Sequence, residues 1–369
     1  MAATTASNAG DERTRDLAPR DDPVGPRARQ RTWQTFLVAG LVVAVYGAVL
    51  PRIASYGEVW QRVGGIRTRG AALLVAAALW NLVTYWFLLM AALPGLSLRE
   101  AAISNQASTA VSNVVPGGGA WGVGVTWTMY RQWGFSREAS ARALLLTSVW
   151  NNFVKLGTPL VAFGLSGLIG GDGDAPRALG LVSLSVLTVS LALLIGSLRS
   201  RAVARRLGSA LGQVASAIRR PFGREPVLDW AERGERMRID AAALVGRRWG
   251  VLTLAAIVSH LALFLVLLTS VRQIGIPAAD VTWLETLTAF ALVRVALLIP
   301  VTPGGAGLAE LGLAGALVAA GGQHPEVVAA VLLFRALTWL LPILLGGLAY
   351  LLWLWEVPSS RRRACSDGA

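Results

Sequence analysis

The hydrophobic positions of this chain gather into long runs, and short polar or charged stretches separate these runs. A helix needs about 20 mostly apolar residues to cross the hydrocarbon of a bilayer, so runs of this length predict membrane-spanning helices. The runs that satisfy this requirement are Trp33–Leu50, Ala71–Ala92, Ala143–Ile169, Ala178–Leu198, Trp249–Thr269 and Val327–Trp355. The pattern therefore predicts an all-α, polytopic integral membrane protein with about six full spans.

Two further apolar segments, Ala101–Trp133 and Thr282–Ala320, are interrupted by proline and glycine. The interruptions are Pro116-Gly117-Gly118-Gly119 and Pro303-Gly304-Gly305-Ala306-Gly307. Such residues end a helix and expose backbone groups, which survive at membrane depth only where protein or a wet cavity shields them. We therefore expect two re-entrant segments, each built from short helices. Interrupted apolar segments at matching places in two halves are the best sequence pointer to a transporter's binding site.

The order of segments repeats in two halves, 71–169 and 249–355. Each half has a span, a broken segment opened by Glu100 or Glu285, and a span that contains Pro159 or Pro342. An even number of spans separates the starts of the halves, so the two halves should begin at opposite faces of the membrane. This predicts an inverted repeat, the architecture associated with alternating access. The alternative is that Gly and Pro are simply frequent in membrane helices.

The charge of the chain follows this topology. It is 54% hydrophobic and 15% charged, with a net charge of +13 and a mean hydropathy of +0.55. Regions expected in the cytoplasm hold 25 of the 34 Lys and Arg residues, as the positive-inside rule requires. These regions are a disordered tail 1–32, the short loops 93–100 and 131–142, a basic loop 199–248 and a tail 356–369, and they flank or interrupt a transmembrane domain 33–355.

This distribution places both termini in the cytoplasm and the protein in the cell membrane. The four arginines of loop 51–70, expected outside, are the exception. Loop 199–248 also carries apolar residues at helical spacing, so it has the alternative of lying on anionic headgroups. The positive charge therefore needs no nucleic acid as a partner, whereas membrane lipids are expected partners.

The two breaks predict an anion site. Leu308–Ala320 is too short to cross the hydrocarbon, so its amino end should lie inside the membrane with free N–H groups, which favour an anion. Ala120–Trp133 repeats this device after the first break. A helix end contributes about 0.3–2 kcal/mol to a bound charge. Carrying a charge through hydrocarbon costs at least ~3 kcal/mol, so a hydrated groove must supply the difference.

Charged residues at membrane depth are costly and therefore functional candidates. Glu310 either complements the amino end of its own helix or contacts a proton or substrate. Arg335 either pairs with Glu310 or holds an anionic headgroup. Lys155, the only lysine in the chain, lines a cavity or lies at an interface. For Arg294 we favour an interfacial position, and for His260 a packed polar role.

Small polar residues also gather on one side of the first broken segment, at Asn105, Ser108, Thr109, Ser112 and Asn113. They line a site or make hydrogen bonds between helices. Combining the breaks with the ionisable residues gives our predicted substrate-binding set: Asn113, Pro116, Gly117, Gly118, Gly119, Lys155, Pro303, Gly304, Gly305, Gly307, Glu310 and Arg335.

Motifs for common catalytic and metal sites are missing from the sequence. It has no phosphate-binding P-loop, HExxH or GxSxG pattern, and its single cysteine, Cys365, excludes an internal disulfide or a thiolate metal site. We therefore expect no enzyme activity, cofactor or metal.

The second break resembles the C-terminal signature of the lysylphosphatidylglycerol synthase transmembrane (flippase-like) family. The residues that carry the resemblance are Pro303 to Glu310, Phe334-Arg335, Leu340-Leu341-Pro342 and Gly346-Gly347, and the resemblance covers roughly Trp60–Trp355. It implies a membrane protein that moves or handles lipids, with Glu310 and Arg335 as the functional pair. Many members carry an acidic residue soon after the first set of glycines, where this chain has Ala120-Trp121-Gly122. The soluble aminoacyl-transferase domain of the bifunctional members is absent, so lipid lysylation is not implied.

We therefore expect lipid translocation or lipid handling in the cytoplasmic membrane, with a phospholipid, an aminoacylated lipid or a polyprenyl-phosphate-linked sugar as cargo. The alternatives are a secondary transporter of a small anion and a non-catalytic membrane partner of a lipid- or glycan-modifying enzyme. The sequence leaves the oligomeric state open.

Overall fold

The computed structural model describes residues 56–115, 118–169, 230–298 and 302–366, with isolated positions between 181 and 209. These residues form helices and turns, with no strand among them. The expected tail 1–32, the span Trp33–Leu50 and most of the span Ala178–Leu198 lie outside the described residues, as does most of loop 199–248 before residue 230.

Four helical stretches in the described part are long and apolar enough to cross a membrane: Thr68–Ala92, Arg137–Ile169, Arg248–Ile274 and His324–Trp355. They contain four of the six expected spans. They correspond to α4 (Thr68–Ala92), α7 (Arg137–Ile169), α10 (Trp230–Ile274) and the continuous series α13 (His324–Arg335), η4 (Ala336–Leu340, a π-helical turn) and α14 (Leu341–Ser366). Two of these helices extend further than expected, because α10 begins inside loop 199–248 and α14 continues into the tail 356–369.

Both broken segments form helical hairpins, as the sequence predicts. The first consists of α5 (Leu98–Val114) and α6 (Gly118–Gln132). The second consists of α11 (Trp283–Ala296) and α12 (Leu308–Ala319), joined through the 3-10 turn η3 (Pro303–Gly305). At about 1.5 Å per residue even α5 is only about 26 Å long, less than the ~30 Å of hydrocarbon. None of these four helices spans a bilayer alone.

The acidic residues that open the broken segments are helix caps. Ser97 N donates to Glu100 Oε2 at 2.9 Å, and Glu100 N donates back to Ser97 Oγ at 3.3 Å. Thr282 and Glu285 form the same reciprocal box at the start of α11, with distances of 2.7 and 3.2 Å. A capping box satisfies two of the free backbone donors of a helix start, which explains why both hairpins begin at these positions.

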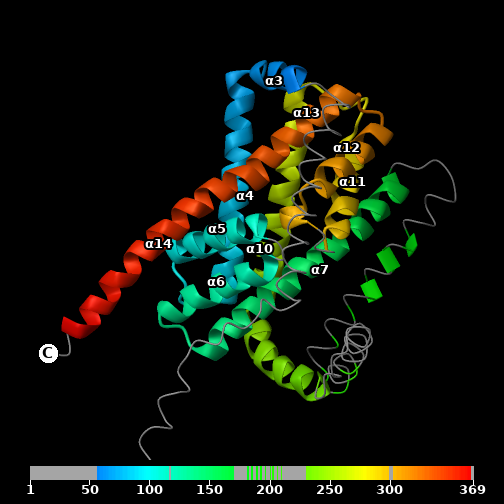
Figure 1. The fold of residues 1–369 in the computed structure, drawn as a ribbon. Coiled ribbons are helices and arrows are strands. Elements are labelled where there is room, and N and C mark those ends of the chain that lie inside the picture. Colours follow the sequence, from blue (N-terminus) through cyan, green and yellow to red (C-terminus); the bar gives the residue numbers. More distant parts are fainter. Residues whose placement is uncertain are drawn as a thin grey trace, which may run out of the picture.

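The two hairpins enter the bundle from opposite ends. Helices α4 and α10 are antiparallel neighbours, because Gly70 near the start of α4 lies against Gln273 near the end of α10. At the other end, Leu88 of α4 shares a buried cluster with Leu252 and Ala256 of α10. Since α5 follows the end of α4 and α11 follows the end of α10, their hairpins start from different ends (Figure 1).

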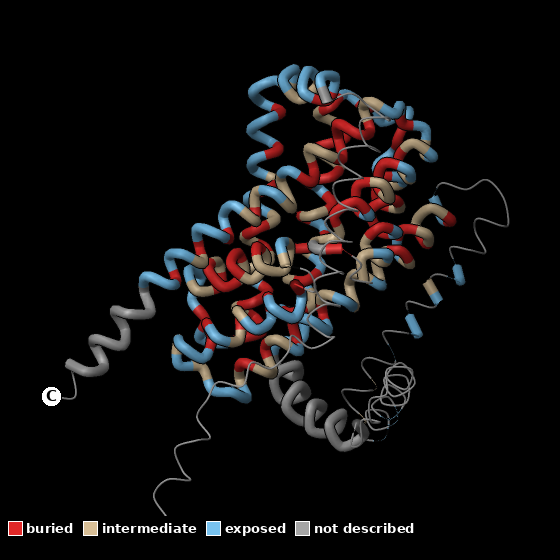
Figure 2. Tube along the Cα trace, in the orientation of Figure 1, coloured by how far each residue is buried: buried red, intermediate tan, exposed pale blue. Residues whose placement is uncertain are grey.

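Two large buried clusters lie toward the two ends of the bundle, and Figure 2 shows buried residues throughout its interior. One lies around the second hairpin and includes Leu267, Phe290 and Leu317. The outward faces of the helices carry large exposed apolar side chains instead, such as Trp80 of α4 and Leu348 of α14. Contact with lipid chains is favourable for such apolar faces, whereas contact with water is not.

Helix α3 (Tyr56–Gly64) lies across the end of the bundle where α13 begins (Figure 1). Arg62 Nη1 donates to Glu326 Oε1 of α13 at 3.0 Å. One of the arginines that contradict the positive-inside pattern of loop 51–70 therefore has a partner in the structure.

Helix α14 packs against α5 through one of two adjacent glycines, which gives a matched test. A Cβ added at Gly346 would overlap the backbone oxygen of Gln106, whereas one added at Gly347 would meet open space. Gly346→Val is therefore expected to destabilise the protein by about 1–3 kcal/mol, the usual effect of overpacking. Unfolding midpoints in an SDS titration measure this, and Gly347→Val should stay close to the wild type. Equal midpoints for the two variants would contradict the packing of α14 on α5.

Candidate functional site

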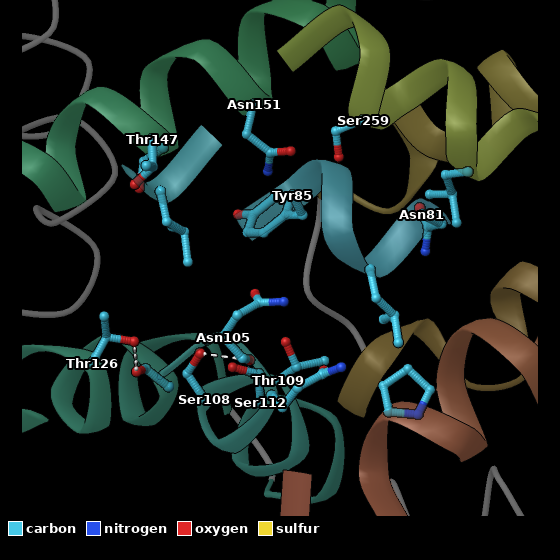
Figure 3. A pocket seen from close by; sticks show the side chains of 18 of the residues that line it. Asn81, Tyr85, Asn105, Ser108, Thr109, Ser112, Thr126, Thr147, Asn151 and Ser259 are labelled. Carbon is cyan, nitrogen blue, oxygen red and sulfur yellow. Dashed lines mark hydrogen bonds between the residues drawn. The ribbon is translucent and has the colours of Figure 1, made fainter. Parts of the chain in front are cut away.

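A polar cavity of about 530 Å³ lies between the first hairpin and the helices α4, α7 and α10. In Figure 3, Tyr85 of α4, Asn151 of α7 and Ser259 of α10 face a row of polar side chains on α5 across this space. A cavity of this kind at membrane depth is expensive to keep unless something polar occupies it. It is therefore the candidate binding site.

Helix α5 supplies the polar wall. Asn105, Ser108, Thr109 and Ser112 all line the cavity, so the polar side that the sequence shows on this segment faces the site. Ser108 Oγ donates to the backbone oxygen of Asn105 at 3.0 Å, which leaves the hydroxyl oxygen free to accept (Figure 3).

Two cations line the cavity, and no carboxylate does so among the described residues. Lys155 comes from α7, and Arg294 comes from the last turn of α11 in the second hairpin. The guanidinium of Arg294 lies 5.6 Å from the centroid of the Phe290 ring, and no described carboxylate is within ion-pair distance of it. The site thus carries positive charge that the described protein atoms do not neutralise. The structure places Arg294 in the wall of this cavity.

Three buried polar atoms of cavity-lining side chains have no hydrogen-bond partner among the described residues: Gln106 Oε1, His260 Nε2 and Arg294 Nε. Gln106 and His260 are only 5% and 6% exposed. His260 Nδ1 lies 2.9 Å from the backbone oxygen of Ala256, and because a carbonyl only accepts, Nδ1 carries the proton. These three atoms have almost no accessible surface, so they lie within the wall of the cavity and not on its open surface.

The cavity opens between α6 and α7. Gly119 and Val123 of α6 and Ser148 of α7 line it and are also exposed. At about 1.5 Å per residue, Val123 lies about 14 Å from the end of α6 and Ser148 about 17 Å from the start of α7. The exposed side of the cavity therefore lies part-way along both helices and not at their ends.

Glu310 and Arg335 form a buried ion pair outside this cavity. Arg335 Nε donates to Glu310 Oε1 at 2.5 Å, and Arg335 Nη2 donates to the backbone oxygen of Gly304 at 3.1 Å. Gly307 N donates to Glu310 Oε2 at 2.6 Å, so the carboxylate caps the amino end of its own helix α12. The pairing alternative considered for Arg335 is thus the one observed, and the pair ties α13 to the second break.

The two breaks meet beside this pair. Gly304 adopts a φ of 57°, and the side chains of Asn113 and Trp339 occupy the space that its Cβ would need. The guanidinium of Arg335 lies 5.2 Å from the Trp339 ring centroid. Because Asn113 ends the polar side of α5, this contact joins the tip of the first hairpin to the tip of the second.

The predicted site residues thus fall into two places. Lys155 and Gly119 line the cavity, whereas Asn113, Gly304, Glu310 and Arg335 form the junction between the hairpin tips. Of the remaining predicted positions, four shape the backbone. Gly118 packs on Ser112, Gly305 and Gly307 have positive φ, and Pro303 begins η3. Pro116 and Gly117 lie outside the described residues.

Sequence reasoning missed Arg294 and the contributions of α4 to the cavity. Asn81 and Tyr85 stand alone in an apolar run at helical spacing, which is the signal that would have found them. Within the described ranges, no three His, Cys, Asp or Glu side chains come together as metal ligands.

The long apolar helices, the two short-helix hairpins and the exposed apolar faces of the bundle are those of a helical integral membrane protein. The chain belongs to the lysylphosphatidylglycerol synthase TM region family, whose model matches residues 36–346, most of its length. This confirms the resemblance seen in the second break. The family places the protein in the membrane with a lipid-related function. No curated protein matches the chain.

Proposed function

We propose that this protein translocates lipids across the cell membrane, or handles them there, without a chemical step. The observation that carries the proposal is the cationic polar cavity, whose exposed lining residues lie on α6 and α7. A headgroup can enter through this opening while its acyl chains stay in the lipid. The polar wall then offsets the cost of moving a charged group through hydrocarbon, which is at least ~3 kcal/mol.

The proposed architecture is an inverted repeat with six full spans and cytoplasmic termini. The antiparallel packing of α4 and α10 supports it, as do the matching capping boxes of α5 and α11. In this scheme the cavity is exposed to one face at a time, and the hairpin tips that meet at Gly304 move relative to each other. Alternating exposure around a fixed midplane site is how inverted repeats carry substrates.

Reconstitution in liposomes tests the proposal. Vesicles that hold a fluorescent phospholipid are treated with dithionite, which quenches only the outer leaflet. Protein-free vesicles should lose about half of the signal, and active proteoliposomes should lose more as inner-leaflet lipid becomes accessible. Activity no greater than in vesicles with an unrelated reconstituted membrane protein, across several headgroups, would contradict the proposal.

A secondary transporter of a small soluble anion is the second candidate, because Lys155 and Arg294 offer positive charge without a nearby carboxylate among the cavity-lining residues. Uptake of radiolabelled inorganic phosphate or a carboxylate into the same vesicles distinguishes the two. Anion uptake without lipid translocation would favour this second function.

A further inference from the structure

The last span has two arms that pack on different parts of the bundle. Helix α13 packs on α3, α10 and α12, whereas α14 packs on α5. The π-helical turn η4 lies between the two arms, and Pro342 follows it. We propose that η4 and Pro342 form a pivot, about which α14 and the first hairpin move as one unit against the rest of the described bundle. This inference rests on the proposed function, because it supplies the motion that alternating exposure of the cavity requires.

The first hairpin and α14 are packed together as one unit. A buried cluster joins Ile103 and Ala107 of α5, Met129 of α6 and Trp353 of α14, and among the described residues no side chain from another helix belongs to it. Helix α5 packs more extensively on α6 and α14 than on α4. Close-packed side chains transmit displacement to one another, so these three helices should move together.

The other arm of the last span belongs to the second hairpin. Val327, Val331 and Phe334 of α13 are part of the buried cluster that also contains Leu267 of α10 and Leu317 of α12. The buried side of the span therefore changes partners over the few residues that contain η4.

The turn η4 has the local structure of a pivot. None of its five side chains is fully buried. Leu341 N donates to the backbone oxygen of Ala336, five positions earlier instead of four. Pro342 has no N–H to donate, and in a regular α-helix its ring would meet the carbonyl of Thr338. Helices bend at π-turns and prolines, and a segment with few buried contacts opens more easily than a packed one.

The position of the pivot links its motion to the cavity. Thr338 and Pro342 both line the cavity. The first hairpin supplies one wall, and α4, α7 and α10 supply the facing wall (Figure 3). A rotation about η4 that carries the first hairpin with α14 therefore changes the distance between the two walls. Helix α7, in contrast, continues as a regular α-helix through its own Pro159, which makes this proline the matched control.

Spin labels on glycines that face open space can measure the motion. Cys365→Ser first removes the only native cysteine. The pair Gly315→Cys on α12 and Gly347→Cys on α14 reports across the pivot, the pair Gly124→Cys on α6 and Gly347→Cys reports within the unit, and the pair Gly64→Cys on α3 and Gly315→Cys reports within the rest. Double electron–electron resonance on the full chain in lipid nanodiscs should give two separate distances across the pivot and one narrow distance for each of the other pairs.

Two variants of the pivot should abolish the second distance. Pro342→Ala restores the missing N–H and favours a regular helix, and deletion of Leu340 removes the additional residue of the π-turn. In both variants the distribution across the pivot should become as narrow as that within the unit, and lipid translocation should fall by about tenfold, because a conformational step is blocked. Pro159→Ala should retain both distances. A monodisperse elution profile and intrinsic tryptophan fluorescence show which variants are folded.

The wild-type measurement decides first. A single narrow distance across the pivot, or equally broad distributions for all three pairs, would overturn the inference whatever the variants do. It would also be overturned if both distances persisted in the folded pivot variants, or if Pro159→Ala lost the second distance equally. Two distances that collapse in these variants, in a protein that does not translocate lipid, would keep the pivot and contradict the proposed function. Translocation by a protein with a single distance would contradict the pivot alone.

Discussion

Replacing Arg335 with alanine is expected to destabilise the protein by about 3–5 kcal/mol, because it leaves the fully buried carboxylate of Glu310 without its cation. The change also removes the hydrogen bond to the Gly304 carbonyl, which holds the second break in place. The unfolding midpoint in an SDS titration and the yield of monodisperse protein measure this effect.

Two comparisons isolate the cause. Replacing the pair together, by Glu310→Leu with Arg335→Met, should recover much of the lost stability, since no buried charge is then left alone. Arg62→Ala breaks the more exposed pair with Glu326 and should cost no more than about 1 kcal/mol. A mild effect of Arg335→Ala, with lipid translocation lost while the fold stays intact, would instead assign this arginine to the substrate.

Replacing Arg294 with methionine is expected to reduce lipid translocation without reducing stability, whereas Arg335→Ala is expected to reduce stability. Translocation of anionic lipid should fall by at least about tenfold, because the phosphate loses a charged partner in a desolvated site. The thermal stability should stay the same or rise, because the variant removes a partly buried guanidinium whose buried Nε has no partner among the described residues. Liposome assays and unfolding curves of the same preparation give both values.

Arg248→Met is the control for Arg294→Met, since it removes an exposed arginine that lies off the cavity. Its translocation rate should match the wild type. Normal translocation in Arg294→Met, or a loss in both variants of similar size, would remove Arg294 from the site.

The sequence predicted the breaks well because their cause is local. Proline and glycine act on the residues beside them, and α12 begins at Leu308, directly after Pro303 to Gly307. The pairing of Glu310 with Arg335 was one of two open alternatives. The sequence also held a sign that the amino end of α12 is occupied, since an acidic residue three positions after Gly307 reaches back to cap it.

The position of the cavity was not predictable in this way, because it depends on tertiary packing. Arg294 lies near the end of an apolar run, and only the opposite insertion of the second hairpin brings it beside Lys155. Asn81 and Tyr85 of α4 have helical spacing, but the sequence does not indicate which other helices that face meets. The cavity proposed to hold an anion therefore lies against the polar side of α5, whereas Glu310 caps the amino end of α12.

The buried cluster around the second hairpin also bears on the ion permeability of the membrane. Phe264, Phe290, Leu313 and Leu317 pack on the side of the bundle that the second hairpin enters, and they are apolar and closed to solvent. Such packing leaves no room for a continuous file of water molecules, so these four side chains offer no aqueous path for ions through this part of the described bundle.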